Sequence, residues 1–146
     1  MVRDFVARGV PIHGVGFQMH ITTGGYPDTA GLRQNFHQIA ALGLQIHITE
    51  MDVRLPITSG AAATADLTTQ AATYSRILTV CLQTPACTAL QTWGFTDKYS
   101  WIPTFFTGFG AALPFDAGYP PKTCVTSLLN AFQSVAPTGD DGECGS

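Results

Sequence analysis

One short segment, an apolar run that ends in two acidic residues, constrains this chain more than any other. Residues 46–48 have the apolar character of a buried strand, and Glu50 and Asp52 follow as the run ends. Because side chains alternate along a strand, both carboxylates are expected on one face. With simple alternation that face also carries Ile46 and Ile48, and the other face carries His47, Thr49 and Met51. Carboxylates beside a buried strand need partners and are common at functional sites, but a strand end where both acids reach water is an equally good interpretation.

Around this segment the chain alternates between strand-like runs and helical periodicity. Strands are expected over residues 10–20, 44–52 and 88–95, and helices before Gly9, over 29–42 and 67–81, and from Pro120 onward. The buried stripe of the last helix is expected to comprise Val125, Leu128, Leu129 and Phe132. Consecutive strand–helix units give parallel strands with right-handed crossovers, so the three strand ends meet on one side of the sheet. That side is where ligands bind in α/β folds.

The composition is typical of a single globular domain with a substantial core. The chain has 146 residues, of which 45% are hydrophobic and 12% are charged, and its net charge is -3. The lack of a basic patch argues against nucleic acid and anionic membrane partners. No apolar run reaches about 20 residues, the length of a membrane span. Residues 137–146 are polar, which predicts a flexible tail or the start of a linker.

The cysteines and histidines favour a disulfide over a metal site. Cys81 and Cys87 bracket a short loop, which predicts a local disulfide and an oxidising, extracellular location. Free buried thiols in a cytosolic protein are the alternative. No two cysteines have the spacing of a zinc site, His13 and His20 are expected far apart, and no His-Glu-x-x-His motif occurs. The dinucleotide fingerprint and the nucleophile elbow are absent too, so we expect neither a metal nor a cofactor.

The rim where the strand ends meet is expected to bring polar and aromatic groups together. These are Gln18, His20, Glu50, Asp52, Trp93 and Trp101. Carboxylates in an aromatic cleft suit sugars, because indole faces stack on pyranose rings while acids and amides bind hydroxyl groups. An ionised Glu50 can attack an anomeric carbon, with His20 holding it and Asp52 orienting the histidine. The alternative is structural, with core tryptophans and a rim histidine that makes ordinary hydrogen bonds.

Three segments of the chain resemble signature segments of glycoside hydrolase family 10. They are Pro11–His20, Ile48–Arg54 and Thr92–Trp101, and residues 115–122 and the Cys81–Cys87 loop fit the same pattern. The family consists of retaining endo-β-1,4-xylanases with a (β/α)8 barrel fold. The resemblance implies that the chain holds the last three βα units, strands six to eight, and that residues 1–136 are the C-terminal part of a catalytic barrel. His13 and Met19 depart from the family pattern, at positions that match no catalytic residue.

By this resemblance Glu50 matches the catalytic nucleophile. His20 and Asp52 match the residues that support it, and Gln18, His20, Trp93 and Trp101 match the subsite for the sugar that is attacked. The implied substrate is xylan or a xylo-oligosaccharide. The family's acid/base glutamate follows an asparagine, and no Asn-Glu occurs in this sequence, whose only other glutamate is Glu143. Since a barrel needs about 250 residues, the N-terminal half of the barrel is an expected partner.

An incomplete barrel has a physical cost. Three parallel strands cannot close, so two sheet edges stay unpaired. The residues expected to lie partly open to water on the barrel-interior face include Ile12, Val15, Phe17, Ile46, Ile48 and Leu90. We therefore expect the isolated chain to be marginally stable or to self-associate, and to hydrolyse xylan weakly or not at all. A non-catalytic xylan-binding remnant and an independent three-unit α/β ligand-binding domain are the alternatives.

Overall fold

The computed structural model of this protein describes residues 1–135, so the predicted tail over residues 137–146 lies outside the described residues. In chain order the elements are α1 Val2–Ala7, β1 Gly14–Phe17, β2 His20–Thr22, α2 Thr29–Ala40, β3 Gln45–Pro56, α3 Thr64–Leu82, β4 Cys87–Thr92, the 3₁₀ helix η1 Asp97–Tyr99, α4 Ile102–Phe105, β5 Phe109–Gly110 and α5 Thr123–Val135. The predicted alternation of strands and helices is confirmed. The predicted strand over 10–20 is split into β1 and β2, and the long loop after β4 contains three short elements.

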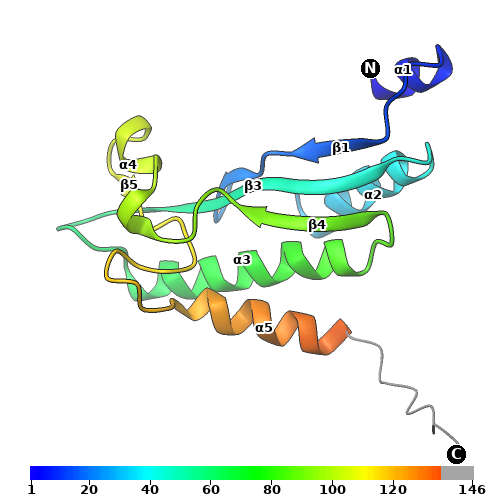
Figure 1. Cartoon of the computed structure of the whole chain (residues 1–146). Helices are drawn as coiled ribbons and strands as arrows, with labels where there is room; N and C mark the ends of the chain where they lie inside the picture. The colour runs from blue at the N-terminus through cyan, green and yellow to red at the C-terminus, as the bar shows by residue number, and fades with distance from the viewer. Residues whose placement is uncertain (136–146) are drawn as a thin grey trace, which may run out of the picture.

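The sheet is built around β3. Strands β1 and β2 pair with one edge of β3 and β4 pairs with the other, all in parallel, while β5 pairs antiparallel with the end of β3. Helices α2, α3 and α5 lie on one face of this sheet, and within residues 1–135 no helix covers the opposite face (Figure 1). The described strands therefore form an open, mostly parallel sheet with the longer helices α2, α3 and α5 on a single side, as in part of a barrel.

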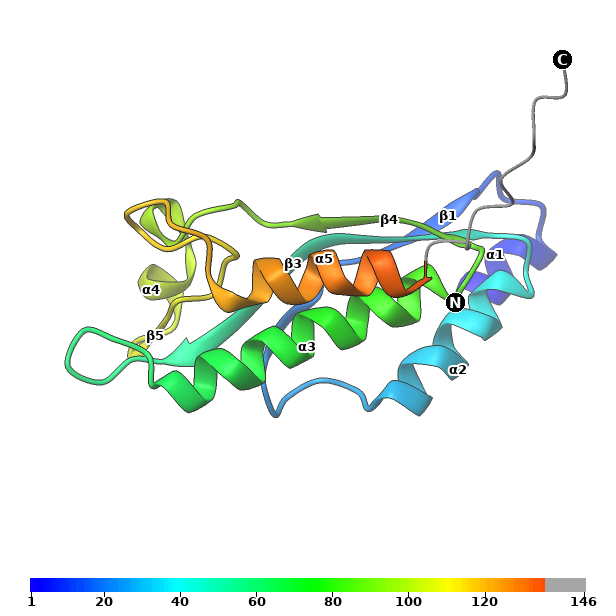
Figure 2. The same ribbon diagram turned by 90° about the horizontal axis from the view of Figure 1, so that it is seen from below.

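The two helices that follow β2 and β3 are present where the sequence predicts them, although α3 begins at Thr64, before the expected start at residue 67. Asp28 caps α2, because its Oδ1 accepts a hydrogen bond from the backbone N–H of Gly31 at 2.7 Å. Leu32 and Phe36 of α2 are buried beneath the sheet, and α3 buries a stripe that includes Tyr74. Figure 2, which views the molecule from the helix side, shows α3 lying beside α5. These contacts form the hydrophobic core under β3.

A β-bulge in β3 reverses the faces of the strand just before the acidic pair. Phe17 pairs with Ile48 and His20 pairs with Asp52, so three steps along β1 and β2 match four steps along β3. Against β4, the three steps from Ile48 to Met51 match the two from Leu90 to Thr92. One residue of β3 is therefore extra relative to both neighbours. Buried positions change accordingly, from Ile46 and Ile48 before the bulge to Met51, Val53 and Leu55 after it.

The predicted faces of β3 are therefore wrong for the carboxylates. Met51 and Val53 belong to the core beneath the sheet, so Glu50 and Asp52, their neighbours in sequence, project from the opposite face. The prediction that both carboxylates share a face with Ile46 and Ile48 holds only for a strand without a bulge. The bulge separates the two groups.

The expectation of an open apolar interior face is wrong for four of its six residues. Ile46 and Ile48 have 0% exposure, and the half-buried Phe17 and Leu90 pack against the same core on the helix side. Ile12 and Val15 are half-buried. The uncovered face of β3 instead carries Gln45, His47 and Thr49, which line a shallow hollow with residues of β1. This face is polar, so it exposes less hydrophobic surface than expected.

The face of α5 also differs from the prediction. Cys124 and Ala131 are its buried residues, because α5 packs against α3 along that stripe. Leu129 and Phe132, which were expected to be buried, are 57% and 53% exposed. They line a groove of about 720 Å³ between α5, α3 and the outer edge of β4, to which Leu128 contributes as well. An apolar groove beside an unpaired strand edge is a surface on which further structure can pack.

The predicted disulfide is present. Cys81 and Cys87 are bonded, which joins the end of α3 to the start of β4. Cys124 forms no disulfide within the described residues, and burial raises the pKa of its thiol. Cys144 lies outside those residues. Among the helices of residues 1–135, not one combines the length and the apolar character that a membrane crossing requires.

Candidate active site

The structure brings the predicted site residues together at the carboxyl ends of the parallel strands. Gln18 and His20 come from the junction of β1 and β2, and Glu50 and Asp52 come from the bulged part of β3. Trp93 and Trp101 follow β4, and both pack near the His20 ring. The pairing of β2 with β3 places His20 directly opposite Asp52. The parallel sheet therefore assembles this rim from segments that are far apart in the sequence.

His20 bridges the two carboxylates. Its Nε2 lies 3.1 Å from Oε2 of Glu50, and its Nδ1 lies 2.7 Å from Oδ2 of Asp52. A doubly protonated imidazole donates to both carboxylates, whereas a neutral ring has one donor and serves only one of them. The amide nitrogen of Gln18 donates a longer hydrogen bond, 3.4 Å, to the other oxygen of Glu50. Both oxygens of Glu50 are therefore held in place, and its carboxylate is oriented.

The three side chains joined by these contacts differ in their exposure to solvent. The side chain of Asp52 is 0% exposed, and those of His20 and Glu50 are 19% and 21% exposed. Oδ2 of Asp52 also accepts a hydrogen bond from the indole Nε1 of Trp101 at 2.9 Å, while its Oδ1 has no partner within the described residues. A buried carboxylate is costly unless it is paired. Asp52 thus depends on His20 and Trp101, and in return it fixes the orientation of both.

Two tryptophans border the His20 ring with different exposure. The ring centroid of Trp101 lies 4.9 Å from that of His20, and the centroid of Trp93 lies 6.3 Å away. Trp101 is half-buried and packs against Phe105 and Phe106. Trp93 is 50% exposed, so the interpretation of Trp93 as a core residue is wrong. An exposed indole beside a carboxylate offers a flat apolar face next to hydrogen-bonding groups.

Sequence reasoning missed part of this site. The guanidinium of Arg54 lies 4.1 Å from the centroid of the Phe106 ring, and Phe106 in turn packs edge-on against Trp101 at 5.5 Å. The signal for Arg54 is its position two residues after Asp52, on the same side of β3. The signal for Phe106 is only its presence in the aromatic loop, the aromatic-rich segment over residues 96–119 that follows β4. Cation–π packing of this kind fixes the loop that carries Trp101.

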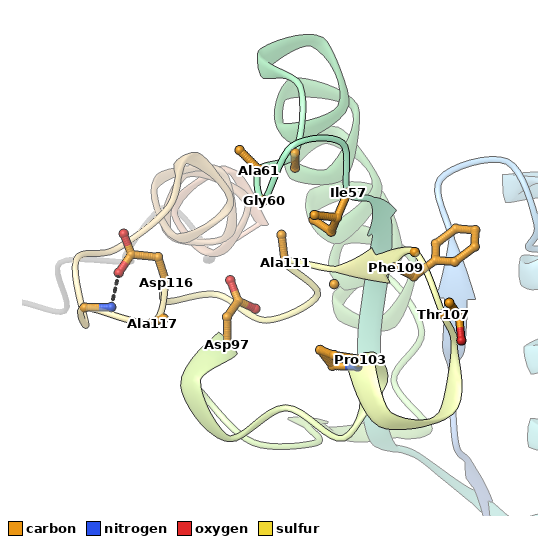
Figure 3. Close-up of a pocket in the computed structure, with 14 residues that line it drawn as sticks. Ile57, Gly60, Ala61, Asp97, Pro103, Thr107, Phe109, Ala111, Asp116 and Ala117 are labelled. Atoms are coloured by element: carbon orange, nitrogen blue, oxygen red, sulfur yellow. Dashed lines mark hydrogen bonds between the residues drawn. The ribbon is translucent and has the colours of Figure 1, made fainter.

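A second cavity lies apart from these residues. It measures about 720 Å³ and is lined by the loop after β3 and by segments near β5, including Ile57, Pro103 and Asp116. Figure 3 shows its labelled residues, among them Asp97 and Ala111. Neither Glu50 nor His20 lines it. Asp97 is occupied by an ion pair with Lys122 at 2.9 Å and by the backbone N–H of Leu113 at 2.8 Å, which ties the loop after β4 to the segment before α5.

The site as a whole offers an oriented carboxylate on an aromatic rim. Within residues 1–135, no three His, Cys, Asp or Glu side chains gather as metal ligands would. The chemistry that these residues support is nucleophilic attack or charge stabilisation by Glu50, with a neighbouring apolar face for a ligand. A second acid that could give a proton to a leaving group is not among the groups bonded in the Glu50, His20 and Asp52 cluster.

Comparison with known proteins connects this geometry to one family. The sequence model described as "Glycosyl hydrolase family 10" matches residues 1–131. Endo-1,4-beta-xylanase B of Thermotoga neapolitana is 49% identical over 133 residues, which cover 91% of this chain and 38% of that protein. Endo-1,4-beta-xylanase 5 of Pyricularia oryzae is 43% identical over 143 residues, covering 94% and 34%. The chain therefore spans little more than a third of these relatives.

Solved structures agree with the sequence comparison. Native xylanase 10B from Thermotoga maritima superposes with a TM-score of 0.87 at 45% identity, covering 92% of this chain and 40% of that protein. Xylanase 10B from Thermotoga petrophila, solved in complex with xylobiose, gives the same TM-score, identity and coverage. Most of this chain thus corresponds to part of a larger structure of this kind.

Proposed function

Since the chain belongs to glycosyl hydrolase family 10, we propose that it is the nucleophile-bearing part of a retaining endo-β-1,4-xylanase. In this proposal the strands of the open sheet, β1 with β2, then β3, then β4, are strands six, seven and eight of a (β/α)8 barrel. Residues 1–136 are its C-terminal part. The open sheet and the match to 40% of a solved relative support this assignment.

The observation that carries the proposal is that both carboxylate oxygens of Glu50 are hydrogen-bonded. Its carboxylate is bound on one oxygen by His20 at 3.1 Å and on the other by Gln18 at 3.4 Å. A nucleophilic carboxylate must be ionised and aimed, and hydrogen bonds donated to it favour the ionised form. In the first step Glu50 forms a bond to the anomeric carbon of a xylose unit while the glycosidic oxygen leaves with a proton. Water then releases the sugar from Glu50 with retention of configuration.

The groups around Glu50 have supporting roles in the proposed reaction. Asp52 keeps the imidazole of His20 in place from its buried position. Trp93 and Trp101 present indole surface on which the sugar that is attacked can pack, and Gln18 is placed to bind a hydroxyl group. The ligand class is xylan or xylo-oligosaccharides, the substrate class named for the relatives.

In this proposal the proton donor of the first step lies in a part of the barrel outside these 146 residues. The sequence has no Asn-Glu pair, and its only glutamate besides Glu50 is Glu143, in the tail. We therefore propose that the N-terminal part of the barrel is the partner of this chain and supplies the acid/base. The disulfide between Cys81 and Cys87 supports an extracellular location for the assembled enzyme.

Covalent labelling tests the role of Glu50. The chain is joined to the N-terminal part of a related xylanase, and the completed barrel is treated with a 2-fluoro-xylobioside, which traps the glycosyl-enzyme. The expected adduct is on Glu50, and Glu50→Gln abolishes both the adduct and hydrolysis. Asp116→Asn, a change at an acid outside the cluster, is the matched control and is expected to label normally. An adduct on another residue overturns the assignment.

A second candidate function is sugar binding without turnover. The 50% exposure of Trp93 favours it, because an indole can bind a pyranose without any acid/base partner. Titration of the isolated chain with xylo-oligosaccharides, followed by tryptophan fluorescence, separates the two candidates. Binding in the isolated chain, with no hydrolysis even in the completed barrel, supports this second function. An independent α/β domain would instead give one sharp unfolding transition in calorimetry.

A further inference from the structure

Met19 has a backbone conformation that residues with side chains rarely adopt. Its φ is +53°, in the left-handed region, and it lies between Gln18 and His20, the two residues that bind Glu50. The left-handed conformation is unfavourable for methionine, because its Cβ comes too close to a carbonyl oxygen. Strain of this kind persists only where the surrounding structure imposes it, and it is concentrated at functional sites.

The conformation of Met19 allows the side chains of Gln18 and His20 to reach the same carboxylate. On an uninterrupted strand the residues on either side of Met19 would be about 6.6 Å apart along the strand. The two oxygens of Glu50, by contrast, are bonded to one carbon. The strand is interrupted here, since β1 ends at Phe17 and β2 starts at His20. The turn at Met19 lets Gln18 reach one oxygen of the carboxylate and His20 reach the other, at 3.4 and 3.1 Å.

The position of Met19 also matches the bulge in β3. Between the pairs Phe17 with Ile48 and His20 with Asp52, β3 has one residue more than its neighbour. Met19 lies in this shorter connection, and its carbonyl accepts a hydrogen bond from the backbone N–H of Asp52 at 3.3 Å. The left-handed residue thus lets the neighbouring chain resume pairing with β3 after the bulge. The bulge directs Glu50 away from the core, and the connection between β1 and β2 supplies the groups that bind it.

We propose that Met19 is a positioning residue whose left-handed backbone, rather than its thioether side chain, aligns Gln18 and His20 on the carboxylate of Glu50. The side chain itself is half-buried and packs against the core. Any residue that adopts the left-handed conformation therefore preserves the alignment, and a β-branched residue, for which that conformation is a strong outlier, disturbs it. The proposal rests on the proposed function only in treating Glu50 as a nucleophile, because the alignment is a property of the unliganded chain.

Four substitutions in the 146-residue chain distinguish the effect of the backbone conformation of Met19 from the effect of its side chain. Met19→Gly and Met19→Asn remove the thioether but favour positive φ, Met19→Leu keeps an apolar side chain of similar size, and Met19→Val adds β-branching. The measurement is proton NMR of the His20 ring N–H groups, at a pH where the parent chain shows both resonances, since these protons are protected from exchange when they are hydrogen-bonded. His20→Gln identifies their resonances. Far-UV circular dichroism confirms that each variant is folded.

The expected result is that the Gly, Asn and Leu variants retain the resonance of the Nε2–H bonded to Glu50. Met19→Val is expected to lose that resonance and to keep the Nδ1–H resonance from the bond to Asp52. Loss of the Nε2–H resonance in both the Gly and the Asn variants would overturn the proposal, even if the Val variant did not fold. Retention of both resonances in a folded Val variant would overturn it as well. Because no substrate is used, a failure of xylan hydrolysis leaves this test unaffected.

Discussion

The indole N–H of Trp101 donates to Oδ2 of Asp52 at 2.9 Å, across a separation of 49 residues. The carboxylate that accepts this bond is 0% exposed and also binds the ring of His20. A residue of the aromatic loop after β4 is thereby joined to the strand that carries Glu50. The bond therefore joins the proposed sugar-binding surface and the residues that support the proposed nucleophile, Glu50, into one hydrogen-bonded unit.

Removing this bond is expected to destabilise the fold. Trp101→Phe keeps an aromatic ring but leaves the Asp52 carboxylate with one donor fewer, and a hydrogen bond to a charged group contributes about 1.5–3 kcal/mol. Urea unfolding followed by circular dichroism measures the loss. Trp93→Phe is the control, since Trp93 is 50% exposed and is expected to change the free energy of unfolding by about 0.5 kcal/mol or less. Equal losses in the two variants would show that the bond to Asp52 contributes nothing.

Gln70 is expected to be important for the connection between α3 and the sheet. Its buried amide nitrogen donates to the carbonyl oxygens of Val53, at 2.7 Å, and Ala111, at 2.6 Å. Gln70→Leu leaves both carbonyls without this donor, so we expect a loss of roughly 2–3 kcal/mol in the free energy of unfolding. Gln38→Leu, at an exposed position of α2, is the matched control. A change no larger than that of the control contradicts the prediction.

Tyr74 is expected to make the fold sensitive to alkali. Burial raises the pKa of its hydroxyl well above the usual 10.0, and the hydroxyl donates to the carbonyl oxygen of Ala112 at 2.7 Å. Below pH 10 the hydroxyl is protonated in both states, so its contribution to stability is fully present. Above that pH the unfolded chain loses the proton while the folded chain keeps it, and the free energy of unfolding falls by about 1.4 kcal/mol per pH unit.

Tyr74→Phe removes this titration, so the variant is less stable at neutral pH but loses less stability between pH 10 and 11. Chemical unfolding at a series of pH values measures the slope. The half-buried Tyr26, whose hydroxyl accepts from Arg76 at 2.8 Å, provides the comparison variant Tyr26→Phe. A slope for Tyr74→Phe equal to that of the parent chain would refute the assignment.

The groove between α5 and β4 is expected to make the isolated chain self-associate. Phe132 is 53% exposed in this groove, next to the outer edge of β4, and an apolar surface beside an unpaired edge favours association. Phe132→Glu is expected to shift the chain towards the monomer in sedimentation equilibrium. Gln133→Glu adds the same charge at the next, exposed position and should leave association unchanged. A parent chain that is monomeric at every concentration rules the prediction out.

The isolated 146 residues are expected to release little or no reducing sugar from xylan. A retaining glycosidase needs both a nucleophile and an acid that protonates the leaving oxygen, and loss of such proton transfer typically costs a factor of about 100 to 10,000 in rate. Reducing-sugar release by the purified chain and by the completed barrel, at equal molar concentration, is the comparison. Turnover by the chain alone at the rate of the completed barrel would contradict the need for an outside proton donor.

Much of the site follows from local patterns in the sequence. The cap at Asp28, the buried stripe of α3 and the loop between Cys81 and Cys87 each depend on residues that are close together in the chain, and each is present in the structure. The convergence of the strand ends needs only the rule that successive βα units make parallel strands. For this reason the grouping of His20 with Glu50 could be predicted without coordinates.

By itself the sequence determined which elements form, which strand ends meet and which side chains are available there. The tertiary structure decided which way those side chains point, because a bulge in β3 and the left-handed turn at Met19 depend on how neighbouring strands pair. Register is a relation between segments distant in the chain, and one extra residue reverses every face beyond it. The tertiary structure also decided the burial of Asp52 and the exposure of Phe132, since both depend on which other elements cover them.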